Sequence, residues 1–161
     1  MKLYSFCILF FVTLCFSACT DSAVVSEFED LDKEGWAIDS AKVFQFVVED
    51  ENQAYDLYYH VRNEIDYPFY NLYVKYELKD GEGKTLNSKM SEVLLMDEKT
   101  GRPFGSGGGG VYDHEVLVLS DYSFPKSGDY SFSLRQYMRR DTLPNIQAIG
   151  FSLKKAKNKN E

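Results

Sequence analysis

The sequence has little of the residue types from which most enzyme sites are built. It contains three cysteines, all within the first 19 residues, and only two histidines, His60 and His114. A zinc site needs several convergent ligands, and a nucleophilic serine would need one of these two histidines as its base. No Gly-x-Ser-x-Gly motif occurs, and the acidic residues are scattered. We therefore expect no catalytic residue, no metal site, no cofactor and no small-molecule substrate, and predict that the protein is not an enzyme.

Positive charge is also scarce. Lys and Arg number 18 against 25 Asp and Glu, which gives a formal net charge of −7. Binding to phosphate backbones needs clustered basic side chains, so we expect no nucleic-acid partner. The one basic cluster, KKAKNK at 154–159, lies at the C-terminus. We expect residues 156–161 to form a basic, disordered tail.

The sequence lacks an apolar run long enough to span a membrane. The uncharged stretch at 3–16 has 14 residues, whereas a spanning helix needs about 20. Its length, with Lys2 before it, fits the apolar region of a secretory signal. The small residues of FSA precede Cys19, which is the pattern of a bacterial lipoprotein signal. The alternative is an ordinary signal peptide that happens to contain Cys19.

The lipoprotein interpretation divides the N-terminal region into two parts. Residues 1–18 are then a lipoprotein signal peptide that is removed, and Cys19 becomes the acylated lipid anchor. Acyl chains stabilise membrane attachment by about 0.8 kcal/mol per buried methylene. Residues 19–34 are polar and acidic without sustained periodicity, so we expect a lipidated N-terminus followed by a flexible tether.

From residue 35 onward, apolar side chains recur at every second position, and no segment has a convincing helical period. The clearest alternating segments are 42–50, 55–63, 71–80, 129–137 and 148–155. Two further strands are expected near 88–96 and 112–120. Turn-forming sequences such as DGEGK and PKSGD separate them. These are the marks of half-buried antiparallel strands. We predict an all-β fold, a single antiparallel β-sandwich over residues 35–155, either jelly-roll or immunoglobulin-like.

Two segments between the expected strands are candidates for contact with a partner. The turn at 66–71 concentrates aromatic residues, which, if exposed, are typical of a binding edge. The irregular stretch at 97–114 contains GSGGGG, and glycines keep a backbone flexible or let another surface approach closely. The simpler interpretations are turn chemistry with core aromatics, and a plain flexible loop. The candidate interaction surface comprises Tyr67, Pro68, Tyr70, Asn71, Asp97, Gly101, Phe104 and Gly105.

Several blocks of the chain together resemble a known family. After Cys19 they are EGW at 34–36, VRNEIDYPFYNLYV at 61–74, MDEKTGRPFGSG at 96–107, FPKSGDYSFSLRQYMR at 124–139 and IQAIGFSL at 146–153. With these blocks the chain resembles the gliding-motility lipoproteins of the GldH type, from Bacteroidetes. The resemblance implies an outer-membrane lipoprotein, needed for gliding and associated with the machinery that also serves type IX secretion. Only Cys19 carries over with a definite role, as the acylated residue.

Our leading hypothesis is a non-catalytic structural and interaction lipoprotein, anchored to the outer membrane, with other envelope proteins of the gliding and secretion machinery as partners. One alternative is a surface lipoprotein that binds glycans through Tyr67, Tyr70 and neighbouring aromatics. Another is an envelope hydrolase that uses His114 as its base. The residues after Cys19, TDSAVV, contain one acid and no acidic cluster, which favours the periplasmic face over the cell surface.

Overall fold

The computed structural model describes residues 23–157, and within that range it contains strands and no helix. The strands are β1 (Ala23–Asp30), β2 (Trp36–Ala37), β3 (Lys42–Val48), β4 (Ala54–Glu64), β5 (Asn71–Asp80), β6 (Thr85–Leu94), β7 (Ser106–Gly108), β8 (Val111–Ser123), β9 (Gly128–Gln136), β10 (Thr142–Leu143) and β11 (Ile146–Lys155). All pair antiparallel. The all-β prediction is confirmed. Among these residues no helix is long and apolar enough to cross a membrane.

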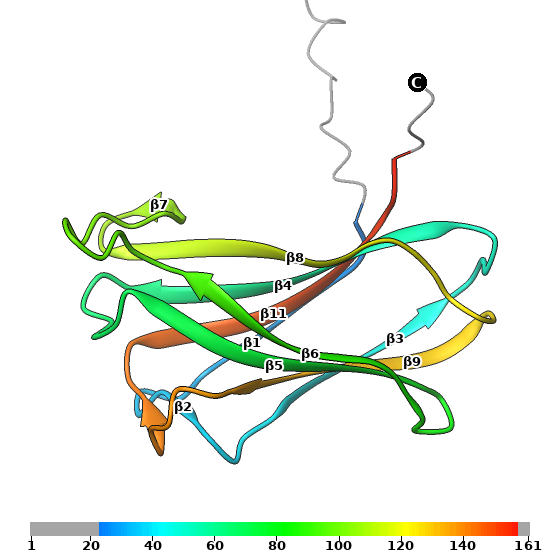
Figure 1. Cartoon of the computed structure of the whole chain (residues 1–161), viewed down its shortest axis with the longest axis horizontal. Helices are drawn as coiled ribbons and strands as arrows, with labels where there is room; N and C mark the ends of the chain where they lie inside the picture. The colour runs from blue at the N-terminus through cyan, green and yellow to red at the C-terminus, as the bar shows by residue number, and fades with distance from the viewer. Residues whose placement is uncertain (1–22, 158–161) are drawn as a thin grey trace, which may run out of the picture.

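Two sheets face each other. One has five strands in the order β1-β11-β4-β8-β7, the other has four in the order β3-β9-β5-β6, and β10 pairs separately with β2. In Figure 1 the five-stranded sheet forms the upper layer and the four-stranded sheet the lower one. The pairings are nested along the chain: β1 with β11, β3 with β9, β4 with β8 and β5 with β6. Eight long strands nested in this way form a jelly roll, which decides between the two topologies left open by the sequence.

The alternation read from the sequence places the core between the sheets. On β4, Tyr55, Leu57, Tyr59 and Val61 are all buried, because one face of the strand packs inward and the other faces solvent. Phe151 of β11 lies at the centre. Its ring centroid is 4.9 Å from that of Phe46 on β3 and 4.8 Å from that of Phe132 on β9.

Such aromatic pairs are worth about 0.5–1.5 kcal/mol each beyond the area that they bury. They therefore help to hold the two sheets together.

The expected flexible tether over 19–34 is wrong for residues 23–30. Residues 23–30 form β1, which pairs with β11 from Ala23 opposite Lys154 to Asp30 opposite Ala148. β1 is an edge strand with most of its side chains exposed, so it shows no hydrophobic alternation; its order comes from backbone hydrogen bonds that composition does not reveal. The sandwich thus includes residues 23–30, which the sequence had assigned to the tether. The signal peptide and Cys19 lie outside the described residues.

The expected irregular stretch at 97–114 is also shorter than predicted. Its glycine run forms β7 and a tight hairpin with β8, in which Gly108 pairs with Val111. The two residues between them, Gly109 and Gly110, have φ of 66° and 89°. A type I′ turn requires positive φ at both central positions, and this turn suits the twist of a hairpin. The glycines are therefore needed for a defined turn.

The C-terminal end is ordered slightly further than expected. The Ala156 N–H donates to the Ala54 carbonyl at 2.9 Å, so this residue, assigned to the tail from the sequence, still contacts the sandwich. Residues 158–161 lie outside the described part of the chain.

Candidate interaction surfaces

The structure brings the two predicted segments, the 66–71 turn and the 97–105 loop, to one end of the sandwich. The Leu95 and Met96 N–H groups both donate to the Tyr70 carbonyl, at 2.8 and 3.0 Å, and the Phe104 N–H donates to the Leu95 carbonyl at 3.0 Å. The two segments therefore share backbone partners although about thirty residues of sequence separate them.

Two of the predicted surface residues are interior. Tyr67 is 4 % exposed, and its hydroxyl donates to the Asn71 carbonyl at 3.2 Å. Burial raises the pKa of Tyr67. The Asn71 side chain is also buried and donates to Glu92 Oε1 at 2.7 Å. Neither can contact a partner here, and the glycan-binding alternative loses one of its two tyrosines.

Asp97 and Gly101 shape their own loop. The Asp97 Oδ1 accepts hydrogen bonds from the Thr100 N–H and Thr100 hydroxyl, both at 2.8 Å, and from the Lys99 N–H at 3.2 Å. The bonds from Thr100, above all, lower the pKa of Asp97. Gly101 has φ of 68°, in the left-handed region that favours glycine. Both residues are explained by local turn chemistry.

Gly105 is explained by packing against His114. A Cβ at Gly105 would lie 2.7 Å from His114 Nε2 and 2.7 Å from the Asp113 carbonyl oxygen. His114 is buried, with Nε2 in a hydrogen bond of 2.9 Å to Asn63 Oδ1, and burial lowers its pKa. This ring nitrogen is thus engaged inside the protein, which offers no support for the hydrolase alternative.

The remaining predicted residues are Pro68, Tyr70 and Phe104, which are exposed. Phe104 is the most open, at 57 %. We call these three residues the end patch. They are the part of the candidate surface that could meet another protein.

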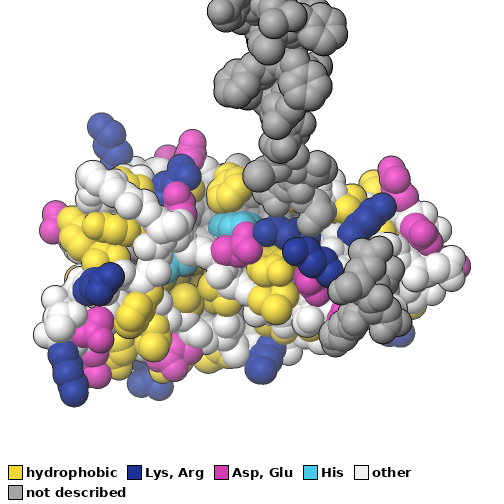
Figure 2. All heavy atoms as spheres, turned by 90° about the horizontal axis from the view of Figure 1, so that it is seen from above, with side chains coloured by type: hydrophobic (Ala, Val, Ile, Leu, Met, Phe, Trp, Pro, Cys, Tyr) yellow, Lys and Arg dark blue, Asp and Glu magenta, His cyan; other side chains and the backbone are white. Residues whose placement is uncertain are grey.

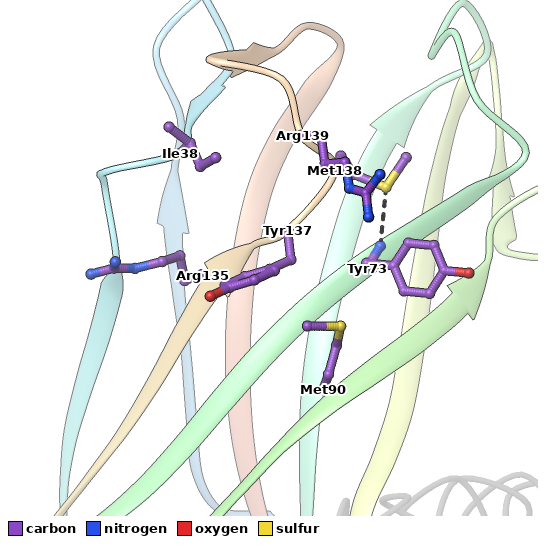
Figure 3. Close-up of a pocket in the computed structure, with 7 residues that line it drawn as sticks. All are labelled: Ile38, Tyr73, Met90, Arg135, Tyr137, Met138 and Arg139. Carbon is purple, nitrogen blue, oxygen red and sulfur yellow. Dashed lines mark hydrogen bonds between the residues drawn. The ribbon is translucent and has the colours of Figure 1, made fainter.

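A second surface was not predicted from the sequence. It is a groove of about 760 Å³ on the outer face of the four-stranded sheet, shown in Figure 3. We call it the sheet groove; it is lined by Ile38, Tyr73, Met90, Arg135, Tyr137, Met138 and Arg139. These residues come from β5, β6, β9, the segment after β9 and the segment after β2.

Hydrogen bonds hold the floor of the sheet groove. The Tyr73 N–H donates to Met138 Sδ at 3.2 Å, the dashed line of Figure 3, and the Tyr137 N–H donates to the Tyr73 carbonyl at 2.8 Å. The buried Gln136 side chain accepts from the Met138 N–H at 2.9 Å and donates to the Arg140 carbonyl at 2.7 Å. The segment that follows β9 is therefore fixed against the sheet.

The sequence did contain a signal for the sheet groove. Tyr73, Arg135 and Tyr137 occupy the positions that the two-residue period assigns to solvent, and Met90 lies opposite Lys75 on that same outer face. Exposed apolar side chains that lie next to one another on a solvent face are typical of an interaction site.

The outer face of the five-stranded sheet differs from the sheet groove, because several of its side chains pair with one another across strands. Phe28 of β1 lies over the His60 ring, with centroids 5.0 Å apart, and the His60 Nε2 and Ser152 Oγ are 2.8 Å apart in a hydrogen bond. Lys154 Nζ is 2.9 Å from Glu115 Oε2. Figure 2 views this side and shows acidic, basic and histidine side chains next to one another. No group of three or more metal-ligating side chains occurs within residues 23–157.

By its fold and surface, the chain is an antiparallel jelly-roll domain that exposes apolar side chains at the end patch and in the sheet groove. The profile of the family described as GldH lipoprotein matches residues 23–153. The chain therefore belongs to the GldH lipoprotein family, and the resemblance drawn from its sequence blocks is confirmed.

Full-length relatives agree with this assignment. The chain is 29 % identical to the gliding motility lipoprotein GldH homolog of Christiangramia forsetii, over 96 % of this chain and 98 % of that protein. It is 23 % identical to gliding motility lipoprotein GldH of Flavobacterium johnsoniae, over 92 % and 91 %. Among solved structures, an arabinose-bound α-L-arabinofuranosidase aligns with 86 % of this chain and 23 % of its own, at 12 % identity and a TM-score of 0.39. A likeness at that level carries no argument about function.

Proposed function

We propose that this protein is a non-catalytic interaction component of the gliding and type IX secretion-associated machinery of the cell envelope. Acylated Cys19 anchors it to the outer membrane, and the sandwich lies on the periplasmic face. The match of the family profile to almost the whole folded domain is the observation that carries this proposal. The end patch supports it, because exposed aromatic side chains at the rim of a rigid domain are typical of protein contacts.

The short distance in sequence between Cys19 and β1 keeps the domain close to the membrane. Only residues 20–22 lie between Cys19 and Ala23, where β1 begins. An extended chain advances at most about 3.6 Å per residue, so the Cα atoms of Cys19 and Ala23 are at most about 14 Å apart. The start of β1 and the end of β11, which pair as Ala23 with Lys154, therefore belong to the membrane-proximal side.

A deletion strain tests the function, and an anchor variant tests the attachment. We expect the deletion strain to lose gliding and export of type IX substrates, and wild-type protein to restore both. Cys19→Ala should leave a folded protein in the soluble envelope fraction that carries no labelled fatty acid and restores neither phenotype. A deletion strain with normal gliding and normal export would contradict the proposed function.

The orientation is tested on intact cells. Protease added outside should leave the sandwich uncut and should degrade it once the outer membrane is permeabilised. Cleavage in intact cells would place the domain on the cell surface and refute the periplasmic assignment, without affecting the proposed role in the machinery.

A further inference from the structure

We propose that the sheet groove docks an acidic segment of a partner protein, with apolar side chains between its carboxylates. The proposal rests on the proposed function in taking the partner to be a protein of the envelope. It adds the site and the chemistry of the contact, which the end patch does not supply.

The composition of the sheet groove is that of a protein contact. Tyr, Met and Arg are enriched at the centres of interfaces, whereas Lys, Glu and Asp are depleted there. The exposed fractions of Tyr137 and Met90 are 46 % and 48 %, so both present apolar area that no part of the described chain covers.

The charge of the sheet groove selects the partner. Among residues 23–157, neither Arg135 nor Arg139 has a hydrogen-bond or ion-pair partner for its guanidinium. The neighbouring carboxylate of Glu77 is already engaged, by Lys75 at 3.1 Å and by Lys79 at 3.2 Å. Two unpaired guanidinium groups beside an apolar floor attract carboxylates, which arginine can bind with two parallel hydrogen bonds.

This local positive charge is opposite in sign to the net charge of the whole chain. The net charge is −7, so a second copy would be repelled at long range. A complementary segment therefore has to place its acids directly on the two arginines.

The position of the sheet groove leaves it free for a protein. It lies on the outer face of the four-stranded sheet, whereas Ala23, which follows the anchor, belongs to the five-stranded sheet. In Figure 1 the start of β1 and the end of β11 lie at the top of the two layers, and β2 lies at the lower left. The groove thus faces away from the membrane-proximal side.

The sheet groove is also largely formed before any partner arrives. Gln136 and the Tyr73 backbone fix the segment that carries Tyr137, Met138 and Arg139. Binding therefore costs little backbone conformational entropy, and most of the entropy loss comes from ordering the exposed side chains.

The experiment uses the full-length acylated protein in a non-ionic detergent and a fluorescent peptide in which Glu alternates with Leu and Phe. We expect saturable binding by anisotropy, weaker at high salt. Arg135→Glu/Arg139→Glu should weaken it about tenfold or more, because like charges then face each other. The same peptide with Lys in place of Glu should not bind the wild-type protein.

A matched control separates the site from the overall charge. Lys33 and Lys84 are exposed and lie outside the sheet groove, so Lys33→Glu/Lys84→Glu makes the same change in net charge and should retain wild-type binding. Circular dichroism of both double variants must match the wild type, since neither arginine holds another residue in place.

Four results would overturn the proposal: no binding of the acidic peptide, equal binding by the arginine variant, a dimer that the arginine variant abolishes, or a neutral oligosaccharide that binds the sheet groove while the peptide does not. Each leaves the deletion phenotype unaffected. Conversely, a deletion strain without phenotype contradicts the proposed function and leaves the peptide measurement intact. The two failures can therefore be told apart.

Discussion

The outer faces of the two sheets differ in whether their polar and charged side chains find partners on the same face. On the five-stranded sheet, His60, Ser152, Glu115 and Lys154 pair among themselves, and Phe28 covers the strand beside them. On the four-stranded sheet, the sheet groove exposes the ring of Tyr137 between two arginines that have no ion-pair partner among the described residues. Side chains that pair with one another on a face stabilise the fold. Exposed side chains without such pairs are available for contact with a partner.

The difference also assigns a role to each side of the molecule. The self-paired face belongs to the sheet that contains β1, the strand nearest in sequence to the proposed anchor Cys19, and the open face belongs to the other sheet. Substitutions on the first should change stability, and substitutions on the second should change binding. Three predictions test this division, and a fourth, which falls between them in expected size, concerns the buried His114.

The largest effect is expected at Gly150 on the self-paired face. A Cβ there would lie 2.6 Å from Phe28 Cδ1 and 2.9 Å from the Glu27 carbonyl oxygen. Gly150→Val should lower the free energy of unfolding by about 2–3 kcal/mol, because overpacking displaces β1. Urea unfolding of the full-length protein measures this.

Two companion variants sharpen that result. Gly108→Val should change stability by no more than about 0.5 kcal/mol, since a Cβ there meets nothing within 4 Å. Phe28→Ala added to Gly150→Val should recover part of the loss. If Phe28→Ala recovers none of the stability lost in Gly150→Val, the clash is not with the Phe28 ring.

The next effect depends on pH and arises from His114. Burial lowers the pKa of His114 in the folded protein below its ordinary value of 6.5, so the unfolded chain binds more protons in the window between the two values. Stability is therefore complete above about pH 6.5 and falls as the pH drops from there to the folded pKa. His114→Gln, which can still donate to Asn63, should remove this part of the pH dependence. The same dependence of the urea midpoint on pH in the wild type and in His114→Gln would contradict this prediction.

A smaller effect is expected for the surface ion pair on the self-paired face. Lys154 Nζ lies 2.9 Å from Glu115 Oε2 and 4.6 Å from the centre of the Tyr58 ring. A double-mutant cycle of Lys154→Ala and Glu115→Gln should give a coupling of at most about 1 kcal/mol, weakened by salt, because the pair is partly exposed. A coupling energy well above about 1 kcal/mol would contradict this prediction, because the pair would then make a major contribution to the stability of the sheet.

The smallest effect on stability is expected in the sheet groove. Tyr137→Ser should change the free energy of unfolding by no more than about 0.5 kcal/mol, as at other exposed positions, while it lowers affinity for the acidic peptide. Val47, which is 52 % exposed on the same sheet and lies outside the groove, provides the control: Val47→Ser should leave both quantities unchanged. A large loss of stability at Tyr137 would make it a structural residue and would break the comparison.

The central strands were predictable because their chemistry is visible in the sequence. β4 and β9 each bury one face, so the period of two marks them. β1 has no such pattern, because it is an edge strand whose order comes from pairing with β11. The glycine run at 105–110 was seen, yet its type I′ turn depends on positive φ at two positions, which glycine permits and does not dictate.

The contact surfaces were predicted less well for a similar reason. The turn and the loop were chosen as separate candidates, and their meeting at one end of the sandwich was not predicted. Burial of Tyr67 and the contact of Gly105 with His114 arise only when distant strands pack. The sheet groove joins residues from three strands and two loops. No local pattern marks it, apart from large apolar side chains on a solvent face.

Site-specific photo-crosslinking in living cells tests most directly whether the four-stranded sheet carries the contact surface. A photoreactive amino acid replaces Tyr137 in one strain and Leu117, on β8 of the five-stranded sheet, in another; the two positions are 46 % and 47 % exposed. We predict a specific crosslink to an envelope protein from position 137, lost with Arg135→Glu/Arg139→Glu, and none from position 117. Crosslinks from position 117 alone, or equal crosslinks from both, would contradict the account.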